Sequence, residues 1–285
     1  MAETRRGGGG PKGGWLRRVR RLSLMVGGVV AVYYTAIFFG QRALMYPCQF
    51  REPVPGAPRE PGRRMWLTHG QGRTPVDFYP GEGRSGDAPG PAVLFAKGNG
   101  DLIGDYRGGL MGYRRRGVSV MLVEYRGCGH AGGSPSYDGI LSDHVAAAAL
   151  LAEQPEVDPD RILYHGRSMG GGFVAALAER VPPAGLVLES AYTSIADFGR
   201  KLYVPGFLVR DPWDVSAALR NYGGPVVISH FERDDIIPYA MSEANRALAP
   251  GHAFFVSTVG HQSPMPDAFF GFVLEAMAER GVAMN

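Results

Sequence analysis

Six short apolar runs, separated for the most part by helical stretches, constrain the fold of this chain more than any other feature of its sequence. Strands that alternate with helices form a mostly parallel sheet with helices on both of its faces. Two further runs, 65–68 and 76–79, flank a glycine-rich turn and predict an antiparallel hairpin ahead of that sheet. The predicted strands of the sheet are 92–96, 118–123, 162–164, 186–188, 226–229 and 253–259, and the predicted helices are 137–153, 169–180, 239–248 and 266–280.

One of the predicted strand-to-helix junctions contains a Gly-x-Ser-x-Gly sequence, from Gly166 to Gly170. A turn of this kind holds its serine in a strained backbone conformation, and the glycines remove side chains that would collide. The hydroxyl of Ser168 is then lifted clear of the sheet, with the amide of Met169 and the start of the helix beneath it. Ser168 is therefore the candidate nucleophile. The alternative is a tight glycine turn with an incidental serine.

The loop after the predicted strand 92–96 is a candidate for binding an oxyanion. Ligands of open α/β sheets bind beyond the carboxyl ends of the strands. In a site built around such a serine, one oxyanion donor comes from this loop and the other is the amide that follows the nucleophile. Asn99 and Met169 are therefore the predicted oxyanion hole.

An acid and a histidine are expected after later strands. Asp234, which follows the run 226–229, is the predicted acid, because a carboxylate can orient an imidazole and stabilise its protonated form. Asp235 can instead cap the following helix, Glu189 follows another strand and is a rival, and His230 is interpreted as structural.

The predicted general base is His261, which comes directly after the last strand. A base must lie on a loop at the same edge of the sheet, within reach of the serine. His261 completes the chain order Ser, Asp, His after successive strands. The remaining histidines lie before a strand, within a strand or helix, in the hairpin or in a glycine-rich loop: these are His69, His130, His144, His165 and His252.

These motifs, taken together and in this order, resemble those of the α/β-hydrolase family. The likeness is to membrane-anchored or secreted serine hydrolases grouped with monoglyceride lipases and serine aminopeptidase-like domains. The resemblance implies Ser168 as nucleophile, His261 as base and Asp234 as acid. It also implies that the amides of Asn99 and Met169 form the oxyanion hole. The matching stretches are 166–171, 124–129 with 133–135, 189–194, 234–238 and 260–261.

Three positions depart from the pattern of that family. Lys97 stands where these enzymes usually have a histidine before Gly-Asn, which predicts a different brace for the oxyanion loop. Phe231 replaces the usual glycine after His230, and Glu124 replaces the usual aspartate. None of these changes removes a predicted catalytic group.

The chain divides by composition into four segments. Residues 1–21 are predicted to be a basic disordered tail, and residues 22–40, uncharged as far as Phe39, a transmembrane signal anchor. A cleaved signal peptide and a buried core helix are the alternatives for the apolar stretch. Residues 41–63 carry five prolines and predict a stiff linker, and residues 64–285 form the predicted α/β-hydrolase catalytic domain. The basic flank places the N-terminus in the cytoplasm and the catalytic domain on the other side of the membrane.

The charge distribution excludes some classes of partner. Seven of the 30 basic residues and only one of the 27 acidic residues lie in the first 21 positions, which leaves a formal charge of −3 for the rest. A slightly acidic body without a basic stripe argues against nucleic acid. The histidines and acids lack metal-ligand spacing, no dinucleotide fingerprint follows a strand, and no cofactor is expected. Of the two cysteines, Cys128 is interpreted as a small buried side chain, with a bridge to Cys48 as the alternative.

The expected function is that of a serine hydrolase that cleaves carboxylic ester or thioester bonds through an acyl-enzyme. The expected substrate is a small molecule or an acylated molecule. The segment 189–225 is long enough for a small helical cover, and its aromatic residues suit either a lipophilic substrate or simple packing. Peptide or amide hydrolysis by the same groups is one alternative. A non-catalytic binding domain of the same fold is the other.

Overall fold

The computed structural model describes residues 12–107 and 110–284. It divides into two compact units, one that ends at Gln41 and one that runs from Arg42 to the C-terminus. The predicted domain boundary lies at residue 64, so the second unit contains more of the chain than the predicted catalytic domain.

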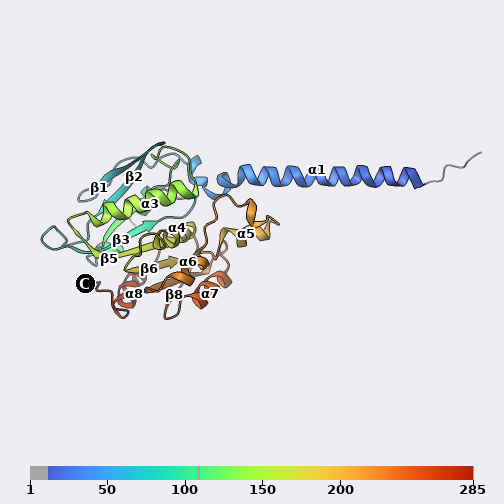
Figure 1. Cartoon of the computed structure of the whole chain (residues 1–285). Helices are drawn as coiled ribbons and strands as arrows, with labels where there is room; N and C mark the ends of the chain where they lie inside the picture. Colours follow the sequence, from blue (N-terminus) through green and yellow to red (C-terminus); the bar gives the residue numbers. More distant parts are fainter. Residues whose placement is uncertain (1–11, 108–109, 285) are drawn as a thin grey trace, which may run out of the picture. The chain divides into compact units, whose positions relative to one another are not determined.

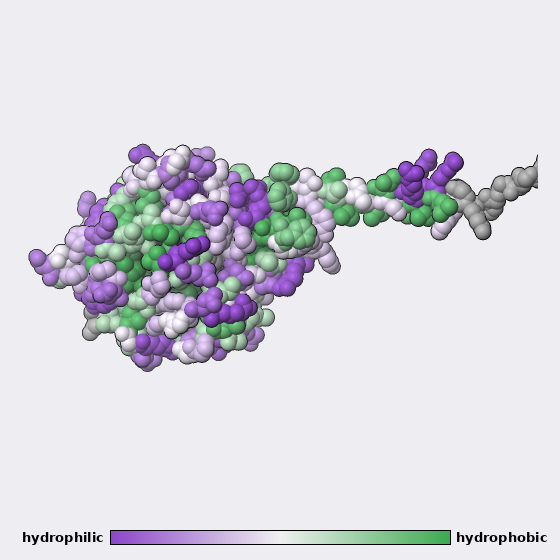
Figure 2. All heavy atoms as spheres, in the orientation of Figure 1, coloured by the Kyte–Doolittle hydropathy of each residue, from purple (hydrophilic) through white to green (hydrophobic). Residues whose placement is uncertain are grey.

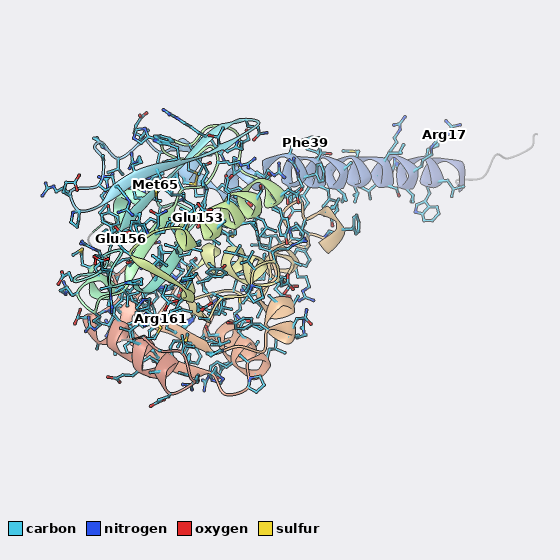
Figure 3. All side chains as sticks on the ribbon, turned by 60° about the vertical axis from the view of Figure 1, so that its left-hand side comes forward. Arg17, Phe39, Met65, Glu153, Glu156 and Arg161 are labelled. Carbon is cyan, nitrogen blue, oxygen red and sulfur yellow. A yellow bond between two sulfur atoms is a disulfide. The ribbon has the colours of Figure 1, made fainter. Side chains whose placement is uncertain are left out.

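The first unit is formed by helix α1, Lys12–Met45, whose last turn belongs to the second unit. The helix is long and apolar enough to cross a bilayer, and most of its apolar side chains before Gln41 are exposed. Figure 2 shows hydrophilic atoms near its N-terminal end, where Arg17 is labelled in Figure 3, and apolar atoms along much of its length. The predicted disordered tail falls partly on residues 1–11, which lie outside the described residues, and residues 12–21 are helical.

The second unit is built on an eight-stranded sheet with the order β1-β2-β4-β3-β5-β6-β7-β8 (Figure 1). The strands β1 and β2 form an antiparallel hairpin, β2 pairs antiparallel with β4, and all other neighbours are parallel. All eight predicted strands are present, and the predicted α/β-hydrolase fold is confirmed. The strands are β1 Arg63–His69, β2 Gly72–Tyr79, β3 Gly90–Ala96, β4 Ser119–Val123, β5 Val157–Arg167, β6 Gly185–Glu189, β7 Val226–Arg233 and β8 Ala253–Gly260.

Helices cover both faces of the sheet, and the central strands are therefore buried along both of their sides. One core cluster contains residues of α3, α4 and α6, and a second contains residues of α2 and α8. The four predicted helices are present, and the segment 189–225 contains α5, α6 and a short turn of 3₁₀ helix, η3. The helices are α2 Met111–Arg114, α3 Tyr137–Ala152, α4 Met169–Ala178, α5 Ile195–Lys201, α6 Val215–Asn221, α7 Tyr239–Leu248 and α8 Asp267–Ala278, with η1 Pro47–Phe50, η2 Ile103–Tyr106 and η3 Gly206–Leu208.

The segment after α1 packs into the domain, although its five prolines predict a spacer. Tyr46 and Cys48 are fully buried, and Cys48 forms a disulfide with Cys128. This bridge corrects the interpretation of Cys128 as an unpaired side chain. The two cysteines are separated by 80 residues along the chain, so their pairing depends on how the loop after β4 meets the segment after α1.

Candidate active site

Ser168 lies between the last residue of β5 and the first residue of α4, as the sequence predicts. Its φ of 52° and ψ of −117° place it in the left-handed region, which is unusual for a residue with a side chain. Backbone hydrogen bonds fix the turn. The Ser168 amide donates to the carbonyl of Glu189 at 2.8 Å, and the Gly171 amide donates to the carbonyl of Ser168 at 3.0 Å.

The glycine at the end of the motif allows α4 to begin against the end of β3. A Cβ atom on Gly170 would lie 2.1 Å from the carbonyl oxygen of Ala96 and 2.6 Å from that of Lys97. No side chain fits such a separation, so only glycine permits this approach. The close contact brings the start of α4, with Met169 as its first residue, beside the loop that carries Asn99.

Asp234 and His261 are in direct contact. Nδ1 of His261 lies 2.7 Å from Oδ2 of Asp234, and the other carboxylate oxygen accepts from the amides of Ile236 at 2.9 Å and Ile237 at 2.7 Å. Burial by itself would raise the pKa of Asp234, but the hydrogen bonds from His261 and from these amides outweigh it. The pKa of Asp234 therefore lies below its usual value, and the carboxylate accepts from the imidazole.

The alternative residues are placed elsewhere. Asp235 is exposed, and Glu189 binds His165 and Arg167 instead of His261. His230 is buried, with Nδ1 2.7 Å from the Ser242 hydroxyl and Nε2 3.9 Å from Asp234. His230 therefore lies near Asp234 but makes its hydrogen bond to Ser242.

Arg167, which the sequence did not predict as a site residue, joins the serine turn to the histidine loop. The guanidinium of Arg167 donates to the carbonyl oxygens of His261 and Ser263, the latter at 2.9 Å, and it lies 3.1 Å from the carboxylate of Glu189. Among the described residues, no hydrogen bond joins the hydroxyl of Ser168 to the imidazole of His261. The two segments are instead held together through the residue that precedes the serine.

Glu189, the carboxylate that pairs with Arg167, is itself held by a buried hydrogen-bond network. Nε2 of His165 lies 3.0 Å from Glu189, and the Tyr113 hydroxyl lies 3.2 Å from Nδ1 of the same ring. Burial would raise the pKa of Glu189, but the nearby Arg167 and the hydrogen bond from His165 hold it below its usual value. The only feature of the sequence that could have indicated this role of Arg167 is its position directly before Ser168, at the first variable site of the Gly-x-Ser-x-Gly motif.

The loop after β3, which carries the predicted oxyanion donor Asn99, is braced by a buried ion pair of the unusual Lys97. Nζ of Lys97 lies 2.9 Å from Glu124 and 3.5 Å from the centre of the Tyr125 ring. Burial lowers the pKa of Lys97, while the neighbouring carboxylate opposes that shift. The second oxygen of Glu124 accepts from the amide of Ile103 at 3.2 Å, so the same carboxylate holds both ends of the loop. Asn99 accepts a hydrogen bond through its carbonyl from the Cys48 amide at 3.3 Å.

A cavity of about 310 Å³ lies beside this group of residues. Arg167 and Gln262, the neighbours of Ser168 and His261 in sequence, belong to its wall, together with the apolar side chains of Phe95, Leu110 and Met265. This volume is at the lower end of the range for small-molecule sites. Within residues 12–107 and 110–284, no group of three or more histidine, cysteine, aspartate or glutamate side chains is arranged to hold a metal ion.

Comparison with known proteins places the chain among hydrolases. Residues 87–210 match the family model described as "Serine aminopeptidase, S33". The uncharacterized protein MT2364 of Mycobacterium tuberculosis (strain CDC 1551 / Oshkosh) is 35% identical over 262 residues, which cover 87% of this chain and 91% of the relative.

Solved structures show the same fold. The 2,6-dihydroxy-pseudo-oxynicotine hydrolase superposes with a TM-score of 0.62 at 18% identity, covering 79% of this chain and 71% of its own. The α/β-hydrolase GrgF from Penicillium sp. sh18 superposes with a TM-score of 0.58 at 13% identity, covering 77% of this chain and 99% of its own. At these identities the likeness extends to the fold alone.

Proposed function

This chain belongs to the α/β-hydrolase family, and from that premise we propose that it is a serine hydrolase that cleaves ester or thioester bonds of acyl compounds. The observation that carries the proposal is the Asp234–His261 contact of 2.7 Å, which lies beyond the carboxyl ends of β7 and β8. Ser168 follows β5 at the same edge of the parallel sheet, in the left-handed turn that suits a nucleophile.

In the proposed reaction the Ser168 oxygen attacks the substrate carbonyl while His261 takes the hydroxyl proton. The amides of Asn99 and Met169 stabilise the resulting oxyanion. The carbon–oxygen or carbon–sulfur bond to the leaving group then breaks, and His261 returns the proton to that group. Water, deprotonated by His261, hydrolyses the acyl-enzyme and regenerates Ser168. Asp234 fixes the imidazole tautomer and stabilises its positive charge throughout.

A peptidase or amidase is the second candidate, because the matching family model carries the description of a serine aminopeptidase. The same nucleophile and base serve both reactions, so the distinction lies in substrate binding. Rates on 4-nitrophenyl acetate and on aminoacyl 4-nitroanilides separate the two. Faster turnover of the anilides would replace the esterase proposal.

The proposed location is a membrane, with α1 as an uncleaved anchor and the catalytic domain on the extracytoplasmic side. The basic residues before the apolar stretch support this orientation. The Cys48–Cys128 disulfide also supports it, because such bridges persist in oxidising compartments. A cleaved signal sequence would give a shortened, soluble product, which N-terminal sequencing of the mature protein detects.

Labelling by a fluorophosphonate probe tests the serine directly. The full chain is expected to react with the probe, and Ser168→Ala is expected to abolish labelling while the protein stays folded. Ser85→Ala is the matched control, because Ser85 is exposed in the loop before β3, at the opposite edge of the sheet. Persistent labelling of Ser168→Ala would remove Ser168 from the proposal.

A further inference from the structure

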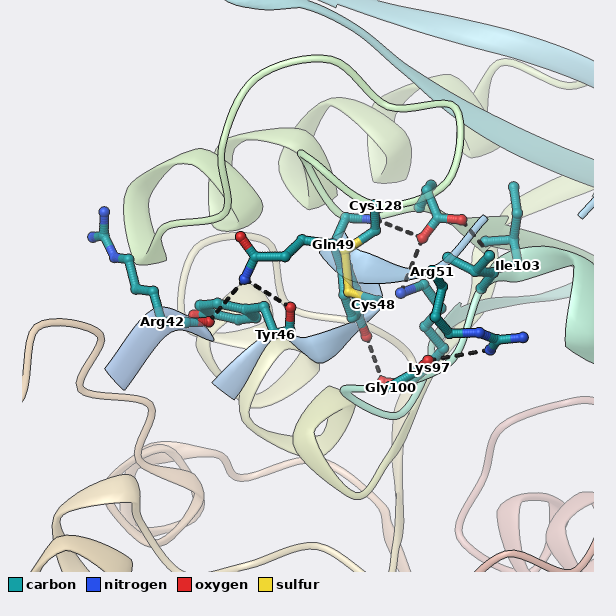
Figure 4. Close-up of a disulfide and its surroundings, with 12 residues drawn as sticks. Arg42, Tyr46, Cys48, Gln49, Arg51, Lys97, Gly100, Ile103 and Cys128 are labelled. Carbon is teal, nitrogen blue, oxygen red and sulfur yellow. Dashed lines mark hydrogen bonds and ion pairs between the residues drawn. A yellow bond between two sulfur atoms is a disulfide. The ribbon is translucent and has the colours of Figure 1, made fainter. Parts of the chain in front are cut away.

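The chain enters the domain from α1 at the edge of the sheet that carries the candidate active site. The amide of Cys48 donates to the carbonyl of Asn99 at 3.3 Å, and Nη1 of Arg51 donates to the carbonyl of Gly100 at 3.2 Å. Figure 4 shows this segment beside the disulfide to Cys128. Because Asn99 and Gly100 follow β3, residues 46–51 lie at its carboxyl end.

The last turn of α1 is also fastened to the segment that follows β6. Two nitrogens of the Arg42 guanidinium lie 2.8 Å from the carboxylate oxygens of Asp211, which is fully buried. The indole of Trp213 donates to the Tyr46 hydroxyl at 2.9 Å. The residues before Asp211, which form α5 and η3, are therefore held close to the C-terminal end of α1.

This segment exposes large apolar side chains. Tyr203 and Phe207 are each 85% exposed, and Leu202 is 52% exposed. We call Leu202, Tyr203 and Phe207 the cover patch. Phe207 is four residues from Asp211, so an extended chain places them at most about 14 Å apart. The patch therefore lies near the point where the apolar helix ends.

The backbone at Tyr203 directs its side chain outward. Its φ of 54° is left-handed, which is costly for an aromatic residue. The turn is fixed by bonds from the Tyr203 amide to the Arg200 carbonyl at 3.0 Å and from the Val204 amide to the Gly199 carbonyl at 2.8 Å, and Val204 is buried. This turn therefore buries the Val204 side chain and exposes the Tyr203 side chain to solvent.

The charges around the cover patch suit an anionic lipid surface. Arg200, Lys201 and Arg210 lie in the segment with two acids, Asp197 and Asp211. Arg200 pairs with Asp197 and Arg42 pairs with Asp211, so the other charged side chains from α5 to Asp211, Lys201 and Arg210, give this segment a net positive charge. Aromatic side chains beside basic ones are typical of surfaces that bind the interfacial region of a bilayer.

We propose that the cover patch docks on the bilayer that α1 crosses, and that the site around Ser168 takes its acyl substrate from that bilayer. The inference rests on the proposed function and narrows its substrate class to membrane-resident acyl esters or thioesters. The chain joins α1 at the catalytic edge, and the exposed aromatic residues are tied to the same point. Docking of the patch would bring this edge to the lipid surface, where the site would meet substrates in the lipid before those in bulk water.

Docking is tested with the full chain reconstituted in phosphatidylcholine vesicles that contain phosphatidylserine. Phe207→Cys is labelled with a nitrobenzoxadiazole dye, because the native cysteines are bonded to each other. Phospholipids with a nitroxide on the acyl chain are expected to quench this dye severalfold more than the same dye at Asp87→Cys. Asp87 is the control because it is exposed in the loop before β3, at the opposite edge.

Equal quenching at the two positions would overturn the proposal. The proposal would also be overturned if the emission of the dye at position 207 changed with the protein-to-lipid ratio but not with the nitroxide lipid. That result would show that the cover patch binds a second copy of the chain. These readouts require no catalysis, so they remain decisive if the proposed hydrolase activity is absent.

Rates of ester hydrolysis test the second part of the proposal, that the substrate comes from the bilayer. The double change Tyr203→Ser and Phe207→Ser is expected to lower hydrolysis of 4-methylumbelliferyl oleate in vesicles by about tenfold, through weaker interfacial binding. Hydrolysis of the water-soluble 4-nitrophenyl acetate is expected to be unchanged. Val181→Ser, after the far end of α4, is the control and is expected to change neither rate. A parallel loss on both substrates would refute lipid-side delivery, and failure of the unaltered chain on both esters would refute the proposed function instead.

Discussion

Replacing Arg167 by methionine removes a charged group that joins the Ser168 turn to the loop of His261. The side chain is buried, and it bonds the carbonyls of His261 and Ser263 and the carboxylate of Glu189. Methionine fills much of the same volume without supplying a donor. Glu189, with 2% of its side chain exposed, is then left with His165 as its partner.

The expected loss of stability is large. Breaking a buried ion pair by removing one partner costs about 3–5 kcal/mol, because the other charge stays buried. Arg161→Met is the matched control in the same strand. Arg161 pairs with Asp158 at 2.7 Å near the surface, where such a pair is worth about 0.2–1 kcal/mol. The unfolding free energies of the two variants should therefore differ by at least about 2 kcal/mol.

The dependence on pH has a defined sign. In the unaltered protein the pKa of Glu189 is depressed, so its contribution to stability is present above its ordinary pKa and is lost as pH falls through the folded-state value. Without Arg167, burial dominates and raises that pKa. The carboxyl then favours the folded state only when protonated. The difference in unfolding free energy between the unaltered protein and Arg167→Met should thus widen as pH rises from below about 4.

Urea unfolding of the full chain in detergent micelles measures these differences, and ester hydrolysis measures the effect on the site. A shift of about 1 Å in the His261 loop can lower turnover about 10²-fold. Arg167→Lys should restore part of kcat, since it retains the charge but not the paired donors. If Arg167→Met matches Arg161→Met in both stability and kcat, Arg167 does not hold the His261 loop in place.

Three further changes test other parts of the site. Gly170→Ala should abolish activity or folding, because its Cβ would overlap the end of β3, whereas Gly206→Ala, with open space around it, should be neutral in both assays. Asp234→Asn should lower kcat by about 10⁴-fold through loss of the useful imidazole tautomer. Asp235→Asn, its exposed neighbour, should leave kcat unchanged, and equal losses would contradict the assignment. Cys128→Ser should lower the free energy of unfolding by about 2–4 kcal/mol, and an unchanged urea midpoint would show that the bridge contributes nothing.

The strands and helices could be predicted from the sequence because each of them shows its own pattern of apolar residues. The runs around Ser168 predicted both the parallel sheet and the turn, and the structure has Ser168 at the φ of 52° that such a turn requires. The apolar stretch after Arg21 likewise predicted a helix. Its start at Lys12 was missed, since glycine and arginine suggested disorder where the helix already runs.

Contacts between distant segments could not be read in this way. Two adjacent carboxylates, Asp234 and Asp235, are nearly equivalent in sequence, and only the path of the loop after β7 decides that the first contacts His261. The partner of Cys48 and the position of residues 46–51 were equally hidden, because the prolines there describe local stiffness and not packing.

By itself the sequence determined the fold class, the order of the strands along the chain and the three residue types that an acyl-transfer site needs. The tertiary structure alone decided that Arg167 binds the loop of His261, that Lys97 and Glu124 brace the loop after β3, and that the segment after α1 reaches the carboxyl end of β3. The physical reason is the range of the forces involved. Propensity and periodicity act between residues a few positions apart, whereas a buried ion pair or a disulfide depends on where the folded chain brings distant residues together.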